Sequence, residues 1–503
     1  MSLQPIIQIN KLRIQANNKT LLYIESLCCN AGEIHAIIGE SGSGKSLTLL
    51  TIIGLLPKNL TVSGEVLLWN DNSFINLLTL SDKDFQAYRG KLIGMVFQEP
   101  MSALNPQLKC GKQMMESFLV HGKKSEALET ISNKLEKVGL GHMVERIMDS
   151  YPHQLSGGQR QRVMIAMASL HKPLVLLADE PTTALDSFSR KQVMEDFTRL
   201  AKEMNCALIW VSHELDLVAN FANQITVLKK GELIEQGITN EIINNPQHPY
   251  VIELLDAVPR PKAQLNIPQN PVLLVKNVFK VYGKGKNQVN ALNNYSVSLS
   301  PGETLAVIGT SGSGKSTLAK LLVALEKPSS GEIQLHGNNI PSKPPTGIQM
   351  VFQDPFASLN RNHTAIFAVS EIISLKNSSI AKKELNEQAI KVLNDVGFDE
   401  RLMNAKPDQM SGGQRQRLCI AKALCTNPEV LILDEAVAAL DPLIQKQILD
   451  LLRDIQLTRK LIYIFITHNL DVAKSLADKW CYLDNGIEKE IPAEWKVKGI
   501  KGL

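Results

Sequence analysis

Two glycine-rich segments of this chain have the residue types that bind phosphate groups. Each has two glycines with four residues between them, then a lysine and a serine, and they read Gly39-Glu40-Ser41-Gly42-Ser43-Gly44-Lys45-Ser46 and Gly309-Thr310-Ser311-Gly312-Ser313-Gly314-Lys315-Ser316, with Thr317 next. Glycines let backbone amides curl around the phosphates of a nucleotide, the lysine adds a positive charge, and the serine hydroxyl can reach Mg²⁺. The sequence therefore predicts two phosphate-binding loops.

An acidic pair follows an apolar run in each half of the chain. The runs are Leu174-Val175-Leu176-Leu177-Ala178 and Val430-Leu431-Ile432-Leu433. A buried strand would carry the acids that follow out of the core, to the edge where the phosphates lie. We expect Asp179 and Asp434 to hold Mg²⁺, and Glu180 and Glu435 to polarise the attacking water.

A histidine ends another apolar strand in each half, 33 residues after the glutamate. His213 follows Trp210-Val211-Ser212, and His468 follows Phe465-Ile466-Thr467. The predicted site still lacks a donor to the terminal phosphate. We expect both histidines to supply it.

A second glycine motif precedes a long apolar helix in each half. The two copies are Leu155-Ser156-Gly157-Gly158-Gln159 and Met410-Ser411-Gly412-Gly413-Gln414, each followed by Arg-Gln-Arg. A serine and two glycines at a helix start form an anion-binding nest. If both phosphate loops face outward, neither nest can serve its own loop, which favours a head-to-tail pair in which each nest covers the other half's nucleotide.

These motifs must lie on two copies of one domain, because their spacing repeats. Gln98 recurs at Gln353, and this pair, like the serine, glutamate and histidine pairs, is separated by 255 positions. The two lysines of the phosphate loops are 270 apart, so the first copy holds about fifteen extra residues, which we place within 63–90. A strand, a glycine loop and a helix are expected in that order in each copy.

Composition is that of a globular protein without membrane spans. The 503 residues are 44% hydrophobic and 21% charged, and no apolar run approaches the ~18 residues of a membrane-spanning helix. No secretion signal is evident, so we expect a cytoplasmic protein. The seven cysteines lack disulfide or zinc spacing. The net charge of +4 gives little support for nucleic-acid binding.

Four prolines in thirteen residues, from Pro259 to Pro271, mark the boundary between the copies. Prolines exclude a continuous helix or strand, so a short, semi-extended tether is expected. The predicted organisation is a first domain at 1–258, a linker at 259–271 and a second domain at 272–503.

Together these motifs resemble the ATP-binding cassette of ABC transporters, twice over. The resemblance implies two tandem α/β ATPase domains of the phosphate-loop type, each with a mixed or parallel sheet and a helical signature subdomain. It assigns Gln98 and Gln353 to a loop that senses Mg²⁺ and touches a membrane partner, and Asp186 and Asp441 to a loop that crosses between the halves. It also implies composite ATP sites, one joining Lys45, Asp179, Glu180 and His213 to Ser411 and Gly413, the other joining Lys315, Asp434, Glu435 and His468 to Ser156 and Gly158.

The segments after Gln98 and Gln353 are similar to those of dipeptide, oligopeptide and nickel importers. So is the first half's tail, Asn245-Pro246-Gln247-His248-Pro249-Tyr250. This resemblance implies an importer ATPase whose two domains are fused in one chain, as in microcin C-type peptide importers. It also implies that the protein lies at the cytoplasmic face of the inner membrane. Its partners would be two permease subunits and, through them, a substrate-binding protein. We expect Met101, Leu104, Phe356 and Leu359 to line the grooves for the permease, with core packing as the alternative.

Two departures from the family pattern matter for the site. Tyr282 stands where the family stacks an aromatic ring on adenine, whereas the stretch 14–18 of the first half has no ring. Pro181-Thr182-Thr183 becomes Ala436-Val437-Ala438 in the second half. A soluble tandem-cassette ATPase acting on ribosomes or DNA is the alternative function, but such proteins carry a long charged linker or zinc cysteines. The substrate is not encoded in this chain.

Overall fold

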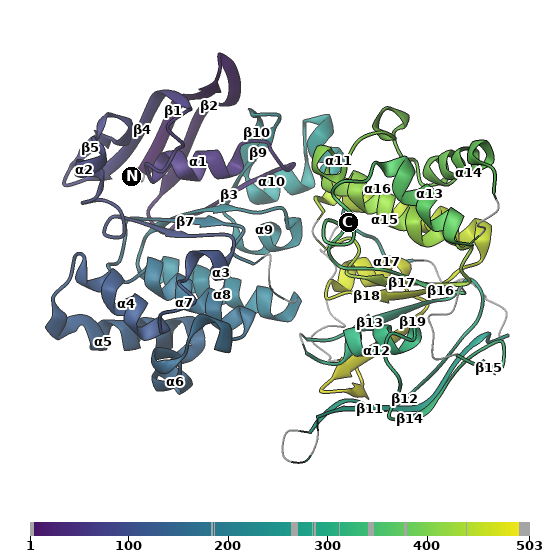
Figure 1. Cartoon of the computed structure of the whole chain (residues 1–503). Coiled ribbons are helices and arrows are strands. Elements are labelled where there is room, and N and C mark those ends of the chain that lie inside the picture. The colour runs from purple at the N-terminus through teal and green to yellow at the C-terminus, as the bar shows by residue number, and fades with distance from the viewer. Residues whose placement is uncertain are drawn as a thin grey trace. The chain divides into compact units, whose positions relative to one another are not determined.

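The structure, a computed structural model, describes residues 5–182, 185, 187–262, 270–283, 285, 288–310, 312–340, 347–376, 380–438 and 440–491, without the side chains of 187 and 188. The chain divides into two compact units, Met1–Leu255 and Asp256–Lys501. Each is described by itself below, and their elements are labelled in Figure 1.

The first unit contains ten strands and eleven α-helices within the described residues. The strands are β1 (Pro5–Ala16), β2 (Lys19–Asn30), β3 (Ile34–Gly39), β4 (Thr61–Asn70), β5 (Ser73–Asn76), β6 (Ile93–Val96), β7 (Val175–Asp179), β8 (Ala207–Val211), β9 (Gln224–Lys229) and β10 (Glu232–Ile238). The helices are α1 (Lys45–Ile52), α2 (Asp82–Phe85), α3 (Pro100–Ala103), α4 (Cys110–Leu119), α5 (Lys124–Leu135), α6 (Val144–Asp149), α7 (Gly157–Ala168), α8 (Ser187–Glu203), α9 (Leu215–Phe221), α10 (Thr239–Asn244) and α11 (Pro249–Asp256, whose last residue falls in the second unit).

The described part of the second unit repeats this order with fewer helices. Its strands are β11 (Leu273–Tyr282), β12 (Val289–Leu299), β13 (Thr304–Ile308), β14 (Ser330–Leu335), β15 (Asn338–Asn339), β16 (Ile348–Val351), β17 (Val430–Asp434), β18 (Ile462–Ile466), β19 (Lys479–Asp484) and β20 (Ile487–Lys489). Its helices are α12 (Lys315–Leu322), α13 (Ala365–Lys376), α14 (Lys382–Asp395), α15 (Gly412–Leu424), α16 (Pro442–Arg459) and α17 (Leu470–Leu476).

Each unit has its own core sheet, and the two sheets have the same strand order. The order is β6-β7-β8-β3-β9-β10 in the first unit and β16-β17-β18-β13-β19-β20 in the second. The strands that carry the predicted site, β3, β7 and β8, pair in parallel, as do β13, β17 and β18. Residues of β3 and β8 are buried throughout, which explains why these strands are continuous apolar runs. Their carboxyl ends therefore meet at one edge, as the sequence predicts.

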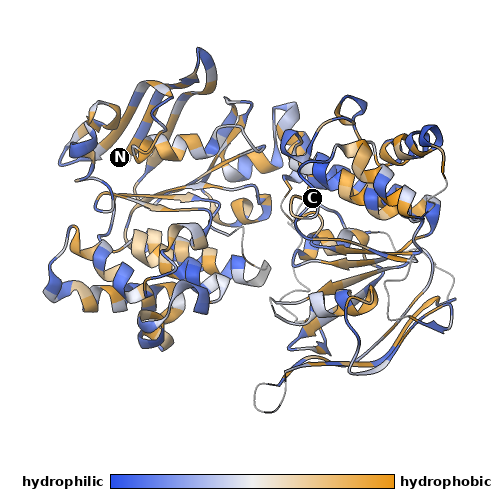
Figure 2. Ribbon diagram, viewed as in Figure 1, coloured by the Kyte–Doolittle hydropathy of each residue, from blue (hydrophilic) through white to orange (hydrophobic). Residues whose placement is uncertain are grey.

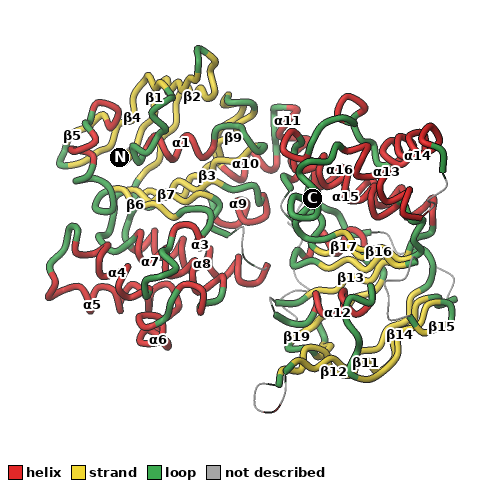
Figure 3. The backbone as a smooth tube through the Cα atoms, in the orientation of Figure 1, coloured by secondary structure: helices red, strands yellow, loops and turns green. Residues whose placement is uncertain are grey.

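An antiparallel layer covers the helix that follows each phosphate loop. Buried residues of β1, β2 and β4 form one core with α1 and the central strands, and the second unit has the same arrangement. In the first unit a bridge between Glu232 and Tyr23 joins this layer to the core sheet, giving ten strands in one sheet, whereas the described strands of the second unit form separate sheets of four and six (Figure 3).

A second apolar core joins the strands of the core sheet to a layer of helices. In the second unit this core includes residues of α13 to α16 together with β17 and β18. Figure 2 shows hydrophobic residues along the central strands and in stripes on these helices. The extra residues of the first unit's repeat include α2, which lies between β5 and β6 in the chain.

Candidate active site

The phosphate loops lie between a core strand and a helix in both units, as the sequence predicts. Lys45 begins α1, and its ammonium donates to the carbonyl oxygens of Gly39 at 2.9 Å and Glu40 at 2.8 Å. Lys315 makes the same contacts to Gly309 and Thr310, both at 2.8 Å. The cation is thus held over a loop of backbone amides at a helix N-terminus, which is an anion-binding arrangement. Ser311 lies outside the described residues.

Glycine is required at the first position of each loop. Gly39 has φ +151°, and a Cβ there would lie 2.1 Å from the carbonyl oxygen of Leu228. The Cβ at Gly309 would lie 2.3 Å from that of Leu483. A strand backbone therefore approaches the loop too closely for any side chain, which explains the residue type in physical terms.

The acids at the strand ends are close to the serine that follows the loop lysine. The Ser46 hydroxyl donates to the Asp179 carboxylate at 3.1 Å. Burial, with a contribution from Glu180, raises the pKa of Asp179. Burial and the neighbouring Glu435 raise the pKa of Asp434 to about 6. These carboxylates are costly to ionise without a nearby cation.

This donor set fits Mg²⁺. Within the described ranges, no cluster of three or more histidine, cysteine, aspartate or glutamate side chains is arranged to hold a metal. Mg²⁺ needs no such cluster, because it takes one or two protein oxygens and completes its shell with phosphate and water oxygens. A hydroxyl and a half-buried carboxylate 3.1 Å apart, beside a phosphate loop, meet that requirement.

The predicted glutamine, glutamate and histidine form one cluster in each unit. In the first unit, Gln98 Nε2 donates to Glu180 Oε2 at 2.8 Å, and His213 Nδ1 lies 3.3 Å from Glu180 Oε1. Burial lowers the pKa of His213, but the hydrogen bond to Glu180 and its charge outweigh burial, so the pKa lies above its ordinary value. The glutamate is therefore held from both sides and stays partly accessible, which suits a base that orients water.

The second unit repeats this cluster. Gln353 Nε2 lies 2.6 Å from Glu435 Oε2, and His468 Nδ1 lies 3.1 Å from Glu435 Oε1. Each histidine thus contacts its glutamate through Nδ1. The same three residue types make the same contacts in both units.

Both glutamates have a backbone conformation that side chains disfavour. Their φ angles are +44° at Glu180 and +47° at Glu435. Each backbone amide donates to the neighbouring strand, to Val211 at 3.0 Å and to Ile466 at 2.9 Å. Such left-handed residues cluster at functional sites, where surrounding contacts over-determine them.

The signature serines begin the helices that the sequence predicts. Ser156 caps α7 and Ser411 caps α15, each in a reciprocal pair of hydrogen bonds with the glutamine three residues later. Each signature therefore places a serine and two glycines at a helix N-terminus, where backbone amides can bind an anion.

Tyr282 lies beside the second phosphate loop. Its hydroxyl hydrogen-bonds Glu326, and Thr317 at the start of α12 also contacts it. Burial and Glu326 raise its pKa. In the first unit the corresponding place is the tight turn at Asn17 and Asn18, whose φ angles of 48° and 64° make a two-residue hairpin between β1 and β2.

The remaining predicted residues have mixed outcomes. Asp441 caps α16 by accepting from the Ile444 amide at 3.1 Å, and Asp186 lies outside the described residues. Leu104 and Leu359 are buried, so core packing is the right account of these two, whereas Met101 is 44% exposed. Phe356 lies under the guanidinium groups of two arginines, at 4.4 and 5.0 Å.

Sequence reasoning missed an ion pair that supports the first histidine. Arg190 of α8 lies 2.6 Å from Glu214, the residue after His213, and both side chains are about nine-tenths buried. The Thr182 hydroxyl also donates to Glu214, at 3.2 Å. The second unit has Gln445 and Asn469 at these positions, which the 255-residue offset could have flagged as a difference.

Comparisons with known proteins agree with this geometry. The family model described as ABC transporter matches residues 24–183 and 292–438. The chain is 37% identical over 493 residues to the uncharacterized ABC transporter ATP-binding protein YejF of Escherichia coli K12, covering 94% of this chain and 92% of that protein. It is 37% identical over 500 residues to the glutathione import ATP-binding protein GsiA of Salmonella choleraesuis, covering 90% and 80%.

A solved structure of an RNase-L inhibitor superimposes with a TM-score of 0.63, covering 94% of this chain and 88% of that one, at 19% identity, which shows the fold alone. The family model accounts for both units, and the sequence identity extends over nearly the whole chain. The chain therefore belongs to the ABC transporter family, as an ATPase with two ATP-binding domains.

Proposed function

We propose that this chain powers the uptake of peptides through a membrane permease. The observation that carries the proposal is the presence of two intact Glu-Gln-His clusters in a chain that resembles a fused import ATPase over nearly its full length. That relative, GsiA, is a glutathione import ATP-binding protein, and glutathione is a small peptide. Related small solutes such as nickel chelates also fall within the proposal.

The proposed ATP sites are composite. Lys45, Asp179, Glu180 and His213 act with Ser411 and Gly413 in one site, and Lys315, Asp434, Glu435 and His468 act with Ser156 and Gly158 in the other. Support comes from the signature serines, each of which begins a helix in a reciprocal pair of hydrogen bonds with the glutamine three residues later. The proposed ATPase domains are residues 1–258 and 272–503, joined by 259–271.

Mg²⁺ is proposed as the metal of both sites. Ser46 with Asp179, and Ser316 with Asp434, supply the protein oxygens, while Gln98 and Gln353 lie against the glutamates. The ion neutralises phosphate charge when bound. Glu180 and Glu435 orient the attacking water, and the lysines and histidines stabilise charge on the terminal phosphate.

The proposed partners are two permease subunits and, through them, a substrate-binding protein, with this chain peripheral at the cytoplasmic face of the inner membrane. None of the described helices is long and apolar enough to cross a membrane. The exposed side chains beside the glutamine loops, Phe97 and Met101 in the first unit and Phe352 in the second, supply an apolar surface for such a partner. ATP favours the closed pair of domains, and hydrolysis removes that preference.

Substitution of the glutamates tests this proposal. Glu180→Gln and Glu435→Gln keep the shape of the side chain and its contact with glutamine but remove the general base, a contribution of about 100-fold or more. The double variant should lose ATPase activity by that factor and lose peptide uptake in cells that express the permease. Near-normal turnover in the double variant would refute the assignment.

A second measurement separates the importer from a soluble machine. Met101→Asp should abolish peptide uptake and co-purification with the permease while leaving basal ATPase activity intact. Ribosome- or DNA-stimulated ATPase activity, with uptake unaffected by Met101→Asp, would support the alternative function, which the similarity to import ATPases does not favour.

A further inference from the structure

The segment from Asp256 to Lys262, which we call the strap, belongs to the second compact unit. It contains the first four residues of the proline-rich linker, and its last described residue is firmly attached. The Lys262 amide donates to the carbonyl oxygen of Lys474 at 2.9 Å. Its ammonium donates to Asp478 Oδ2 at 2.8 Å and to the carbonyl oxygen of Leu476 at 3.4 Å. This part of the linker is thus fixed to the unit rather than a free tether.

Lys262 lies at the carboxyl end of α17. The last carbonyl groups of a helix lack partners within the helix, and a cation there interacts favourably with the helix dipole. Lys474 and Leu476, which accept from Lys262, belong to that last turn. Helix α17 begins two residues after His468. The strap therefore stabilises the helix that follows the histidine of the second active site.

Asp478 connects the strap to the strand of the second phosphate loop. The Asp478 atom that pairs with Lys262, Oδ2, also accepts from the Thr304 amide at 2.9 Å, and the Asp478 amide donates back to Thr304 at 2.9 Å. Thr304 is the first residue of β13, which leads to Gly309. The Lys262 and Asp478 side chains are only 14% and 12% exposed, so water screens their attraction less than at a surface pair.

The first unit anchors its strand in the same way but without charge. Asn223 stands 255 positions before Asp478. Its Oδ1 accepts from the Ile34 amide at 2.9 Å, and its own amide donates to Ile34 at 2.8 Å. A neutral amide therefore suffices for the strand anchor. Within the described residues, the charge of Asp478 adds a contact that Asn223 does not make, namely the ion pair with the strap lysine.

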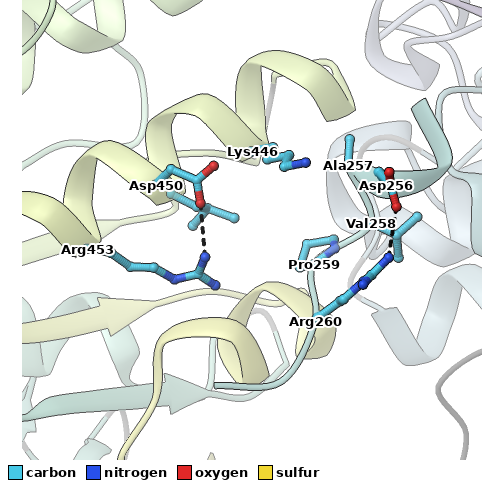
Figure 4. Close-up of a pocket in the computed structure, with 9 residues that line it drawn as sticks. Asp256, Ala257, Val258, Pro259, Arg260, Lys446, Asp450 and Arg453 are labelled. Atoms are coloured by element: carbon cyan, nitrogen blue, oxygen red, sulfur yellow. Dashed lines mark hydrogen bonds and ion pairs between the residues drawn. The ribbon is translucent and has the colours of Figure 1, made fainter. Parts of the chain in front are cut away.

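The rest of the strap borders a cavity of about 310 Å³ (Figure 4). Residues 256–260 form one wall, and Lys446, Leu449, Asp450 and Arg453 of α16 form the other. The ion pairs drawn at this cavity join residues of the same wall, Arg260 with Asp256 at 2.8 Å and Arg453 with Asp450 at 2.9 Å. The hydrogen bonds and the ion pair described here that attach the strap to the rest of the second unit are therefore those of Lys262.

We propose that Lys262 and Asp478 form a positioning pair for the second active site. The pair ties the start of the linker to the carboxyl end of α17 and to the strand that carries the phosphate loop, and so holds His468 in register with that loop. In the first unit, the described contacts of the corresponding Asn223 are with the backbone of Ile34. This inference rests on the proposed role of His468, whereas the attachment of the strap can be tested without it.

Tryptic cleavage of the full chain tests the attachment. Asp478→Asn copies the residue of the first unit, keeps the strand anchor and leaves Lys262 in place. Trypsin must take the Lys262 side chain into its own pocket, so cleavage after Lys262 reports how often the pair opens. We expect cleavage there to become about tenfold faster, the effect of losing a hydrogen bond between charged groups. Asn223→Asp is the matched control and should not change it. Equal cleavage in Asp478→Asn and the parent would overturn the attachment.

ATPase kinetics test the positioning role. Lys262→Met should lower kcat about twofold or more, because one of two sites is misaligned, while KM for ATP stays unchanged since the strand anchor remains. Lys262→Arg should restore kcat. Arg260→Met, which removes a strap cation outside the pair, is the control and should match the parent. If Lys262→Met and Arg260→Met have the same kcat, or if Lys262→Arg fails to restore it, the positioning role is wrong.

Discussion

Acid should weaken the first unit more than the second, because of one buried histidine. His35 lies in β3 with its Nδ1 3.0 Å from the Cys28 carbonyl oxygen and its Nε2 2.7 Å from the Thr226 hydroxyl. Burial lowers the pKa of His35 from 6.5 to about 4. The second unit has Leu305 and Cys481 at the places of His35 and Thr226, as the strand register shows.

The sign and size of the effect follow from that pKa. Because the pKa of His35 is lower in the folded than in the unfolded state, its contribution to the free energy of unfolding is complete above the unfolded pKa of 6.5. That contribution is lost as the pH falls from there through the folded pKa of about 4. One pKa unit corresponds to about 1.36 kcal/mol. Lowering the pH from about 7 to about 4.5 should therefore reduce the free energy of unfolding of the first unit by about 2.4 kcal/mol through His35 alone.

Hydrogen exchange followed by mass spectrometry across a urea series measures this, because peptides report the unfolding of each unit separately. The double variant His35→Leu with Thr226→Cys transplants the apolar pair of the second unit. Its first unit should lose about 2.4 kcal/mol less on acidification than the parent, whereas Thr226→Cys alone, which keeps the histidine, should behave like the parent. An unchanged pH dependence in the double variant would show that His35 is not the acid-sensitive group.

Two further pairs of substitutions probe the sites. Gly413→Ala should lower the free energy of unfolding by about 1–3 kcal/mol, because its Cβ would lie 2.4 Å from Ile444. Gly158→Ala should instead raise the free energy of unfolding by up to about 1 kcal/mol, because its Cβ would meet no described atom nearer than 3.9 Å. Denaturant titration measures both values, and the reverse order of stability would contradict the packing. Tyr282→Ala should raise the KM for ATP roughly threefold to tenfold, whereas Tyr282→Phe should leave it unchanged, because stacking on adenine needs only the ring. Equal effects of the two variants on the KM would instead point to the hydroxyl contact with Glu326.

The elements that carry the site could be predicted from the sequence because their signals are local. Buried parallel strands appear as apolar runs, so β3, β7 and β8 were found together with the acids and histidine at their ends. The carboxyl ends of such strands share an edge. The contacts of Gln98 and His213 with Glu180 follow from that geometry, although the positive φ of Glu180 left no signal in its residue type.

The contacts that the sequence did not reveal join residues far apart in the chain. His35 meets Thr226 across 191 positions, and Lys262 meets Asp478 across 216. No periodicity encodes such pairs, and the proline content alone predicts a short, semi-extended tether rather than one attached at Lys262. Asp441 is a different case, because an aspartate before a proline is a recognisable helix start and could have identified the cap of α16.

The left-handed backbone at Glu180 and Glu435 bears on how such a chain would change if one site were released from selection. Each φ costs about 1–2 kcal/mol for a residue with a side chain, and glycine or asparagine would relieve it. Mutational drift at an idle site would therefore gain stability by discarding the carboxylate. Both units of this chain keep the glutamate and its left-handed backbone, so neither shows the loss of the carboxylate that such drift would favour.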